Sequence, residues 1–160
     1  MSSLKTIISG GQTGVDRAAL DVALKLKIHC TGWCPKGRLA EDGRISALYP
    51  LTETKSIKPE VRTEQNVIDA DATLILTKEH NLDKGSHYTI EMCKKHNKPI
   101  LVLHLEDQNE VLLDTFIKWI SKLKVKTINI GGPRESSIPG IYNSSREILL
   151  FLIRRQITGV

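Results

Sequence analysis

The chain has 160 residues, of which 40% are hydrophobic and 26% are charged. This is the length of one ordinary domain with a folded core, which excludes a disordered or collagen-like chain. Twenty-three basic against eighteen acidic residues give a formal charge of +5, which suits a phosphate-bearing ligand but is too small to indicate nucleic acid binding.

Three cysteines argue against a disulfide framework and for a reducing compartment. The sequence has no run of about 20 apolar residues, and its first residues lack the pattern of an export signal. We therefore expect a cytoplasmic protein that does not enter a membrane.

Five short apolar runs rich in β-branched residues predict strands. None of them alternates between apolar and polar residues, which indicates strands that are covered on both faces. The runs are Leu4–Ser9, Ile28–Trp33, Ala72–Thr77, Pro99–Leu105 and Val125–Ile130.

Five helices are predicted between and after these strands, from apolar periodicity and from the positions of proline and capping residues. They span Gly14–Lys27, Pro59–Ala70, Ser86–Asn97, Asn109–Leu123 and Asn143–Gln156. Alternating strands and helices predict one α/β domain over residues 1–160, a doubly wound, mainly parallel sheet of about five strands in three layers. Right-handed crossovers then place every strand-to-helix turn at one edge, where such sheets bind ligands.

The first of these turns reads Ser9-Gly10-Gly11-Gln12-Thr13-Gly14. Adjacent glycines let the backbone turn tightly and approach a ligand, and free N–H groups at a helix start favour an anion. The pattern is neither the P-loop nor the dinucleotide fingerprint. The alternative is a plain tight turn whose glycines serve packing.

Residues 34–58 show no regular period, and unstructured segments of this length are usually functional or disordered. Lys36, Arg38 and Arg44 lie in this segment, which follows the second predicted strand. We expect these cations above the ligand edge, where they could close over a negative group. The alternative is a solvated basic loop.

The second predicted helix starts at the same edge, so Arg62 in its first turn should point toward the pocket. A cation there opposes the helix dipole, which a negatively charged ligand would explain. Asn66 lies one turn further along the same face.

Two further turns carry glycines and polar residues. Gly85 and Ser86 stand where the third helix should begin, with Thr89 in its first turn, and they predict a second anion pocket. The alternative is that Ser86 caps the helix. After the fifth strand comes Gly131-Gly132-Pro133-Arg134, where Arg134 either clamps a phosphate or carboxylate or stays an exposed loop residue.

The cysteines and histidines show no metal-ligand spacing, so we expect no metal held directly by side chains. No arrangement of nucleophile, base and acid can be assembled either.

Four segments of the chain resemble the "putative molybdenum carrier" family: residues 9–21, 32–43, 62–67 and 131–135. The resemblance covers nearly the whole chain. It implies a Rossmann-like fold, within a superfamily that includes the "lonely guy" nucleotide phosphoribohydrolases. It also implies that molybdenum cofactor, a phosphorylated pterin, is bound in an oligomer without chemical change.

The signature of those hydrolases is only partly present. Arg62 precedes Asp71 of an Ala-Asp-Ala run by the hydrolases' interval of nine residues. Their catalytic glutamate follows the turn threonine by three residues, but Met92 stands at that distance from Thr89. Glu91 is adjacent, yet one residue along a helix turns a side chain by about 100°. The resemblance therefore implies an anion-binding scaffold that lacks the catalytic carboxylate.

We expect a binding or carrier protein for molybdenum cofactor or a related nucleotide, leaning away from an enzyme. The residues expected to bind the ligand are Gly10, Gly11, Gln12, Thr13, Gly14, Lys36, Arg38, Arg62, Asn66, Gly85, Ser86, Thr89, Gly132 and Arg134.

Two alternatives stay open. One is a nucleotide N-glycoside hydrolase in which Arg62 holds the phosphate and Glu91 is the carboxylate. The other is a nucleotide-sensing interaction module. The apolar run Ile148–Ile153 in the last helix favours a partner surface, and we predict a homo-oligomer, a dimer or tetramer, partly built on it. A helix buried at the sheet edge would explain the same run.

Overall fold

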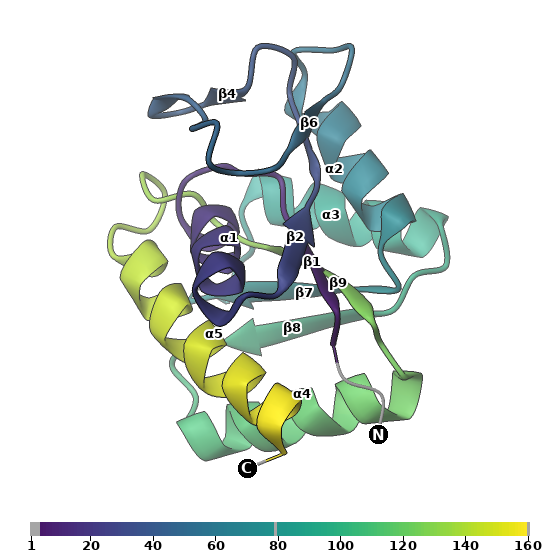
Figure 1. Ribbon diagram of the computed structural model, residues 1–160, viewed down its shortest axis with the longest axis vertical. Coiled ribbons are helices and arrows are strands. Elements are labelled where there is room, and N and C mark those ends of the chain that lie inside the picture. The colour runs from purple at the N-terminus through teal and green to yellow at the C-terminus, as the bar shows by residue number, and fades with distance from the viewer. Residues whose placement is uncertain (1–3, 79, 160) are drawn as a thin grey trace.

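The computed structural model describes residues 4–78 and 80–159, and a five-stranded parallel sheet forms its centre (Figure 1). In chain order the strands are β1 (Thr6–Ile8), β2 (His29–Thr31), β7 (Ala72–Thr77), β8 (Ile100–His104) and β9 (Thr127–Gly131). In space their order is β2-β1-β9-β7-β8. The predicted fold class is therefore confirmed.

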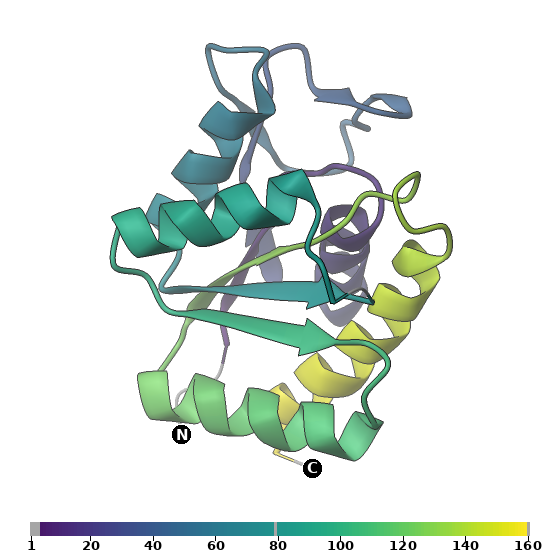
Figure 2. The same cartoon turned by 180° about the vertical axis from the view of Figure 1, so that it is seen from behind.

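The five predicted helices are present, with ends that differ by a few residues. They are α1 (Val15–Leu26), α2 (Pro59–Asp69), α3 (Lys84–Lys95), α4 (Asn109–Leu123) and α5 (Ile141–Thr158). Helix α5 packs against α1 and α4, while α2 and α3 pack together on the other face of the sheet, which gives three layers (Figure 2). The last helix begins two residues earlier than predicted because Gly140, at φ 91°, lets the chain turn into it.

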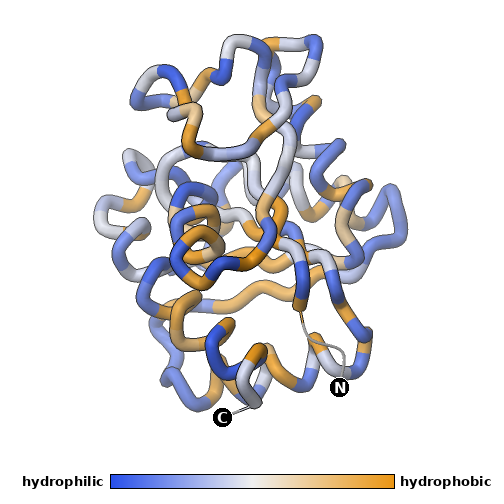
Figure 3. Tube along the Cα trace, in the orientation of Figure 1, coloured by the Kyte–Doolittle hydropathy of each residue, from blue (hydrophilic) through white to orange (hydrophobic). Residues whose placement is uncertain are grey.

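Hydrophobic residues are concentrated along the strands of the sheet and recur along the helices (Figure 3). Those that are buried form one main core between the sheet and the helices. All six residues of β7 are buried, as expected for a central parallel strand covered on both faces. A smaller cluster of Val67, Met92 and Cys93 lies between α2 and α3. Met92 therefore belongs to the packing between these two helices.

The strand order is that of a Rossmann sheet whose last strand has been transferred from the start of the chain. If β9 and α5 preceded β1, the order in space would read 3-2-1-4-5, the order of the common dinucleotide-binding sheet. The backbone N–H of Leu4 donates to Gln156 Oε1 at 3.0 Å, so the chain ahead of β1 lies beside the end of α5. In the permuted order, the chain adds strands toward one side of the sheet from β9 to β2 and toward the other side from β7 to β8. The point where this order reverses lies between β9 and β7, and ligands bind at such switch points.

The segment between β2 and α2, for which the sequence shows no regular period, forms two small strand pairings above the sheet edge. β3 (Trp33–Cys34) pairs in parallel with β6 (Thr52–Glu53), and β4 (Leu39–Ala40) forms a hairpin with β5 (Gly43–Arg44).

Arg38 holds this segment together from inside. Its side chain is buried, and its guanidinium donates four hydrogen bonds of 2.7–3.1 Å to backbone carbonyls. The acceptors are the carbonyl groups of Ile45, Ser46, Tyr49 and Leu51. The expectation that Arg38 faces a ligand is therefore corrected, because its fork is used on the protein's own backbone.

A half-buried carboxylate, that of Asp21, anchors the same segment to the helices below. The hydroxyl groups of Tyr49 and Tyr142 each donate to Asp21 of α1 at 2.5 Å. Burial and then the bond to Asp21 raise the pKa of both phenols, that of Tyr142 to about 12. The segment thus rests on a fixed support.

The apolar run of α5 is largely accounted for by the chain's own core. Ile148, Leu149, Leu152 and Ile153 are buried against other elements. The predicted homo-oligomer stays a prediction, and this helix no longer favours it. Within the described ranges, none of the helices combines the length and the apolar character that a membrane crossing requires.

We predict that Arg38→Ala lowers the free energy of unfolding by about 2–4 kcal/mol, because it removes four hydrogen bonds that a buried guanidinium donates to backbone carbonyls. Urea unfolding measures the loss, and limited proteolysis should show cleavage within residues 39–51. Arg38→Lys is the matched control: it keeps the charge but not the planar fork, and it should restore only part of the stability. Wild-type stability in the alanine variant would contradict this role.

Candidate functional site

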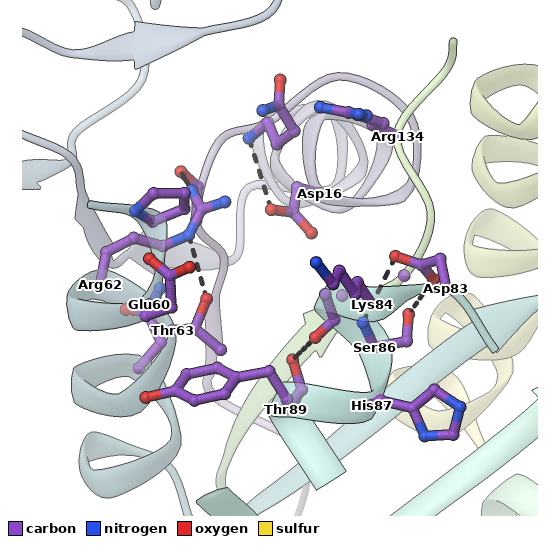
Figure 4. Close-up of a pocket in the computed structure, with 18 of the residues that line it drawn as sticks. Asp16, Glu60, Arg62, Thr63, Asp83, Lys84, Ser86, His87, Thr89 and Arg134 are labelled. Carbon is purple, nitrogen blue, oxygen red and sulfur yellow. Dashed lines mark hydrogen bonds between the residues drawn. The ribbon is translucent and has the colours of Figure 1, made fainter. Parts of the chain in front are cut away.

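A cleft of about 640 Å³ opens at the carboxyl ends of β1, β9 and β7, between α2 and α3 (Figure 4). Its volume lies in the range of small-molecule sites, and it lies at the point between β9 and β7 where the strand order reverses. It is lined by nine of the residues predicted to bind a ligand: Gly10, Gln12, Arg62, Asn66, Gly85, Ser86, Thr89, Gly132 and Arg134. Parts of the chain that are far apart in sequence thus share one rim.

Five of the predicted residues do not line the cleft: Gly11, Thr13, Gly14, Lys36 and Arg38. The two glycines have positive φ angles and serve packing. A Cβ on Gly11 would lie 2.6 Å from Leu51 Cδ1, and one on Gly14 would lie 2.4 Å from the Pro133 carbonyl oxygen. Lys36 is exposed on the segment above.

The backbone of the first turn does not form the open anion cradle that the glycines predict. The N–H groups of residues 11–13, and that of Val15 at the start of α1, donate to acceptors of the protein itself. These pairs are Gly11 to Ser9 Oγ, Gln12 to Asp16 Oδ2, Thr13 to Gln12 Oε1 and Val15 to the Pro133 carbonyl. An anion in the cleft must therefore be held mainly by side chains.

A glutamate from the β4–β5 hairpin ties the first turn to the third. Glu41 accepts hydrogen bonds from the Thr13 hydroxyl and from Ser136, whose hydroxyl lies 2.5 Å away. These bonds hold the pKa of Glu41 below its ordinary value, with Ser136 the largest cause. Thr13 in turn accepts from the Glu135 N–H at 3.1 Å. Thr13 thus shapes the rim instead of facing the cleft.

The start of α3 is occupied by the protein's own carboxylate. Asp83 is the N-cap and accepts from the Ser86 N–H at 3.4 Å and the Ser86 hydroxyl at 2.5 Å. The Thr89 hydroxyl donates to the Gly85 carbonyl at 3.0 Å. The predicted second anion pocket is corrected accordingly, because a carboxylate and two satisfied hydroxyls stand where the anion was expected.

Three cations from separate elements face the cleft (Figure 4). Arg62 of α2 is buried, and its Nη1 donates to the Gly10 carbonyl at 2.9 Å while Nε donates to Thr63 Oγ1 at 3.2 Å. Its Nη2 makes no hydrogen bond to a described residue. Lys84 lies on α3 and Arg134 on the turn after β9, and the sequence interpretation did not single out Lys84.

Asn66 lines the cleft but has a structural task. Its Oδ1 accepts from the Trp33 N–H at 2.7 Å and its Nδ2 donates to the Trp33 carbonyl at 3.1 Å. Both ends of the amide therefore hold β3 against α2.

Asp16, in the first turn of α1, is a second site residue that the sequence interpretation missed. It is 8% exposed, and its carboxylate accepts one hydrogen bond from the described part of the chain, from the Gln12 N–H at 3.4 Å. A Cβ on Gly10 would lie 3.0 Å from its Oδ2, and one on Gly131 would lie 3.4 Å from its Oδ1. The two glycines thus make room for a carboxylate. An acidic residue in a first turn is ordinarily explained by the helix dipole, so its sequence position gave no functional signal.

The charge of Asp16 is disfavoured in this position. Burial raises its pKa from 3.8 to about 6, although Arg62, the Gln12 N–H and Arg17 act in the opposite direction. The side chain points into the cleft, toward the space between α2 and α3 (Figure 4).

Glu91 lines the cleft although the spacing from Thr89 predicts that it is turned away. Met92, at the position of the hydrolases' glutamate, is buried between α2 and α3. A carboxylate is therefore present at the cleft, one residue away from the expected position.

Comparison with known proteins connects the cleft to a family. Residues 7–153 match the model of the circularly permutated YpsA SLOG family. A crystal structure described as a putative molybdenum carrier protein, from Syntrophus aciditrophicus SB, is 39% identical in sequence, with a TM-score of 0.91. The match covers 95% of this chain and 96% of that one. None of the curated proteins matches the chain.

We predict that alanine has different effects at two glycines of the rim, one mainly on stability and the other mainly on anion binding. In Gly132→Ala the new Cβ would lie 2.3 Å from the Leu76 carbonyl oxygen, which should lower the free energy of unfolding by about 1–3 kcal/mol. In Gly10→Ala the new Cβ would meet side-chain atoms of Arg62 and Asp16, the nearest at 2.7 Å. Side-chain ends shift more easily than a backbone carbonyl, so that variant should lose less stability than Gly132→Ala. It should bind inorganic sulfate, a simple probe for a phosphate group, more weakly than the wild type. Urea unfolding and calorimetry test both, and equal destabilisation would contradict the distinction.

We also predict that the free energy of unfolding falls as the pH rises from about 4 to 6, by about 2–3 kcal/mol relative to Asp16→Asn. In this window the folded protein still holds a proton on Asp16, whereas the unfolded chain has lost it. Urea unfolding at several pH values measures the difference. A difference that does not change with pH would contradict a raised pKa in the folded state.

Proposed function

Because the chain belongs to the circularly permutated YpsA SLOG family, we propose that its cleft binds and carries a phosphorylated heterocycle without changing it. The ligand is the phosphorylated pterin of molybdenum cofactor or a related nucleotide. The family resemblance and the name of the similar crystal structure favour the pterin.

The observation that carries this proposal is the set of three cations around one cleft. Arg62 and Arg134 offer planar forks for a phosphate, and Lys84 adds a point charge. Tyr88 and Ile130 supply apolar surface for a ring. The donor set and the volume of about 640 Å³ fit a phosphorylated bicyclic ring. In a carrier the metal chemistry of the cofactor serves another protein, while these residues bind the ligand and neutralise its phosphate.

We expect saturable binding of molybdenum cofactor, or of GMP or AMP, in isothermal titration calorimetry, with the ligand recovered unchanged. Arg62→Met should weaken binding about 10- to 100-fold, because a charge-assisted hydrogen bond to the phosphate is lost. Arg154→Met is the control: it removes the same charge from an exposed position of α5 outside the cleft. No binding of any of these ligands at millimolar concentration would sink the carrier proposal.

A second function is favoured by one observation, the presence of Glu91 at the cleft. Arg62 would hold the phosphate of a nucleotide while the Glu91 carboxylate assists cleavage of the N-glycosidic bond. This function predicts free base released from a nucleoside monophosphate, with the release lost in Glu91→Gln. Chromatography of the incubated nucleotide detects the base, and its release at an unchanged rate by the variant would remove this assignment.

A further inference from the structure

Asp16 and Arg62 face the same point of the cleft without forming an ion pair. A Cβ on Gly10 would lie 2.7 Å from Arg62 Nη1 and 3.0 Å from Asp16 Oδ2. Among the described residues, however, no ion pair of 4.0 Å or less joins the two side chains. An anion that binds the open side of Arg62 must therefore come close to the carboxylate.

Two like charges cannot share so small and buried a space without a cost. The carboxylate is nine-tenths buried and accepts a single, long hydrogen bond among the described residues, so few polar contacts stabilise its charge. A bound anion adds a second negative charge beside it and disfavours ionisation further. A protonated carboxyl group has the opposite effect, because its O–H can donate a hydrogen bond to an oxygen of the anion.

The other charged groups around Asp16 do not remove this conflict. Arg17, on the same helix, is committed to the Gly11 carbonyl and to Asp42. Asp83, at the start of α3, adds a negative charge. Glu60 of α2, His87 and Glu91 of α3, Lys84 and Arg134 line the same cleft. Of the cations around Asp16, Arg62 most strongly favours the charged form of this carboxyl group, so it is the cation that Asp16 and the ligand would share.

We propose that Asp16 couples anion binding to proton uptake: where Asp16 is ionised in the free protein, an anion that binds at Arg62 is accompanied by a proton taken up on Asp16, and the protonated carboxyl group donates a hydrogen bond to that anion. This inference rests on the proposed function in placing the ligand's anionic group at Arg62. It adds a dependence on pH that a cleft with cations alone would not have. The carboxylate then disfavours the bound anion at neutral pH and admits it as the pH falls.

The test uses inorganic sulfate, whose own charge stays constant over the range from about pH 5 to pH 7.5. The wild-type protein and Asp16→Asn are titrated calorimetrically at several pH values, in buffers with different ionisation enthalpies that report the protons taken up. Wild-type affinity for sulfate should fall about tenfold or more from pH 5 to pH 7.5, because the raised pKa of about 6 lies inside this range. Asp16→Asn should bind sulfate with nearly constant affinity, more tightly than wild type at pH 7.5, and without proton uptake.

Asp114→Asn is the control for net charge, since it removes one carboxylate from the exposed surface of α4, outside the cleft. Its pH dependence should equal that of the wild type. The same pH dependence in wild type and Asp16→Asn would overturn the proposal, and so would the absence of sulfate binding to Asp16→Asn at every pH. Sulfate binding with proton uptake but no binding of pterin or nucleotide would contradict the proposed function and leave this coupling intact. Nucleotide binding with no difference between wild type and Asp16→Asn would contradict this coupling and leave the proposed function intact.

Discussion

The cleft depends on two opposite charges that are kept out of water yet apart from each other. Arg62 is held by its hydrogen bonds to the Gly10 carbonyl and to Thr63. Asp16 is held by its position in the first turn of α1, and its carboxylate occupies the space that Gly10 and Gly131 leave free. A closed ion pair would satisfy both groups and leave nothing for a ligand. Because each remains only partly satisfied, the Arg62 guanidinium can still donate to an anion, and the Asp16 carboxyl group can do so once it is protonated.

The topology explains why these groups meet. Parallel strands bring all their carboxyl ends to one edge, and the reversal between β9 and β7 opens a space there between α2 and α3. The described start of the chain lies beside the end of α5, so the permuted order leaves this edge unchanged. The segment above is then fixed from two sides, by Arg38 within it and by Glu41, which joins the first and third turns. The rim is therefore built by contacts between residues that are far apart in sequence.

The sequence was sufficient for the sheet, the five helices and the edge at which polar turns meet, because these follow from periodicity and chirality. It was not sufficient for the purpose of each polar group. Arg38 and Asn66 are residue types that often bind ligands, but here their side chains form hydrogen bonds with nearby backbone groups. At the start of α3, Asp83 accepts the hydrogen bonds that an anionic ligand was expected to accept. Asp16 was missed for the opposite reason. Its role depends on its burial and on the space that Gly10 and Gly131 leave beside its carboxylate. Neither feature produces a recognisable pattern in the sequence.

A carrier needs to bind its ligand and also to release it, and the cleft offers a physical basis for both. Arginine and lysine keep their charge near neutral pH, so on their own they attract an anion of constant charge equally across this range. A buried carboxylate beside them opposes the bound anion by an amount that depends on its protonation. An enzyme that cleaves the ligand would have less need of such a device, because its product leaves in altered form. The placement of Asp16 beside Arg62 therefore agrees better with a protein that returns its ligand intact than with one that consumes it.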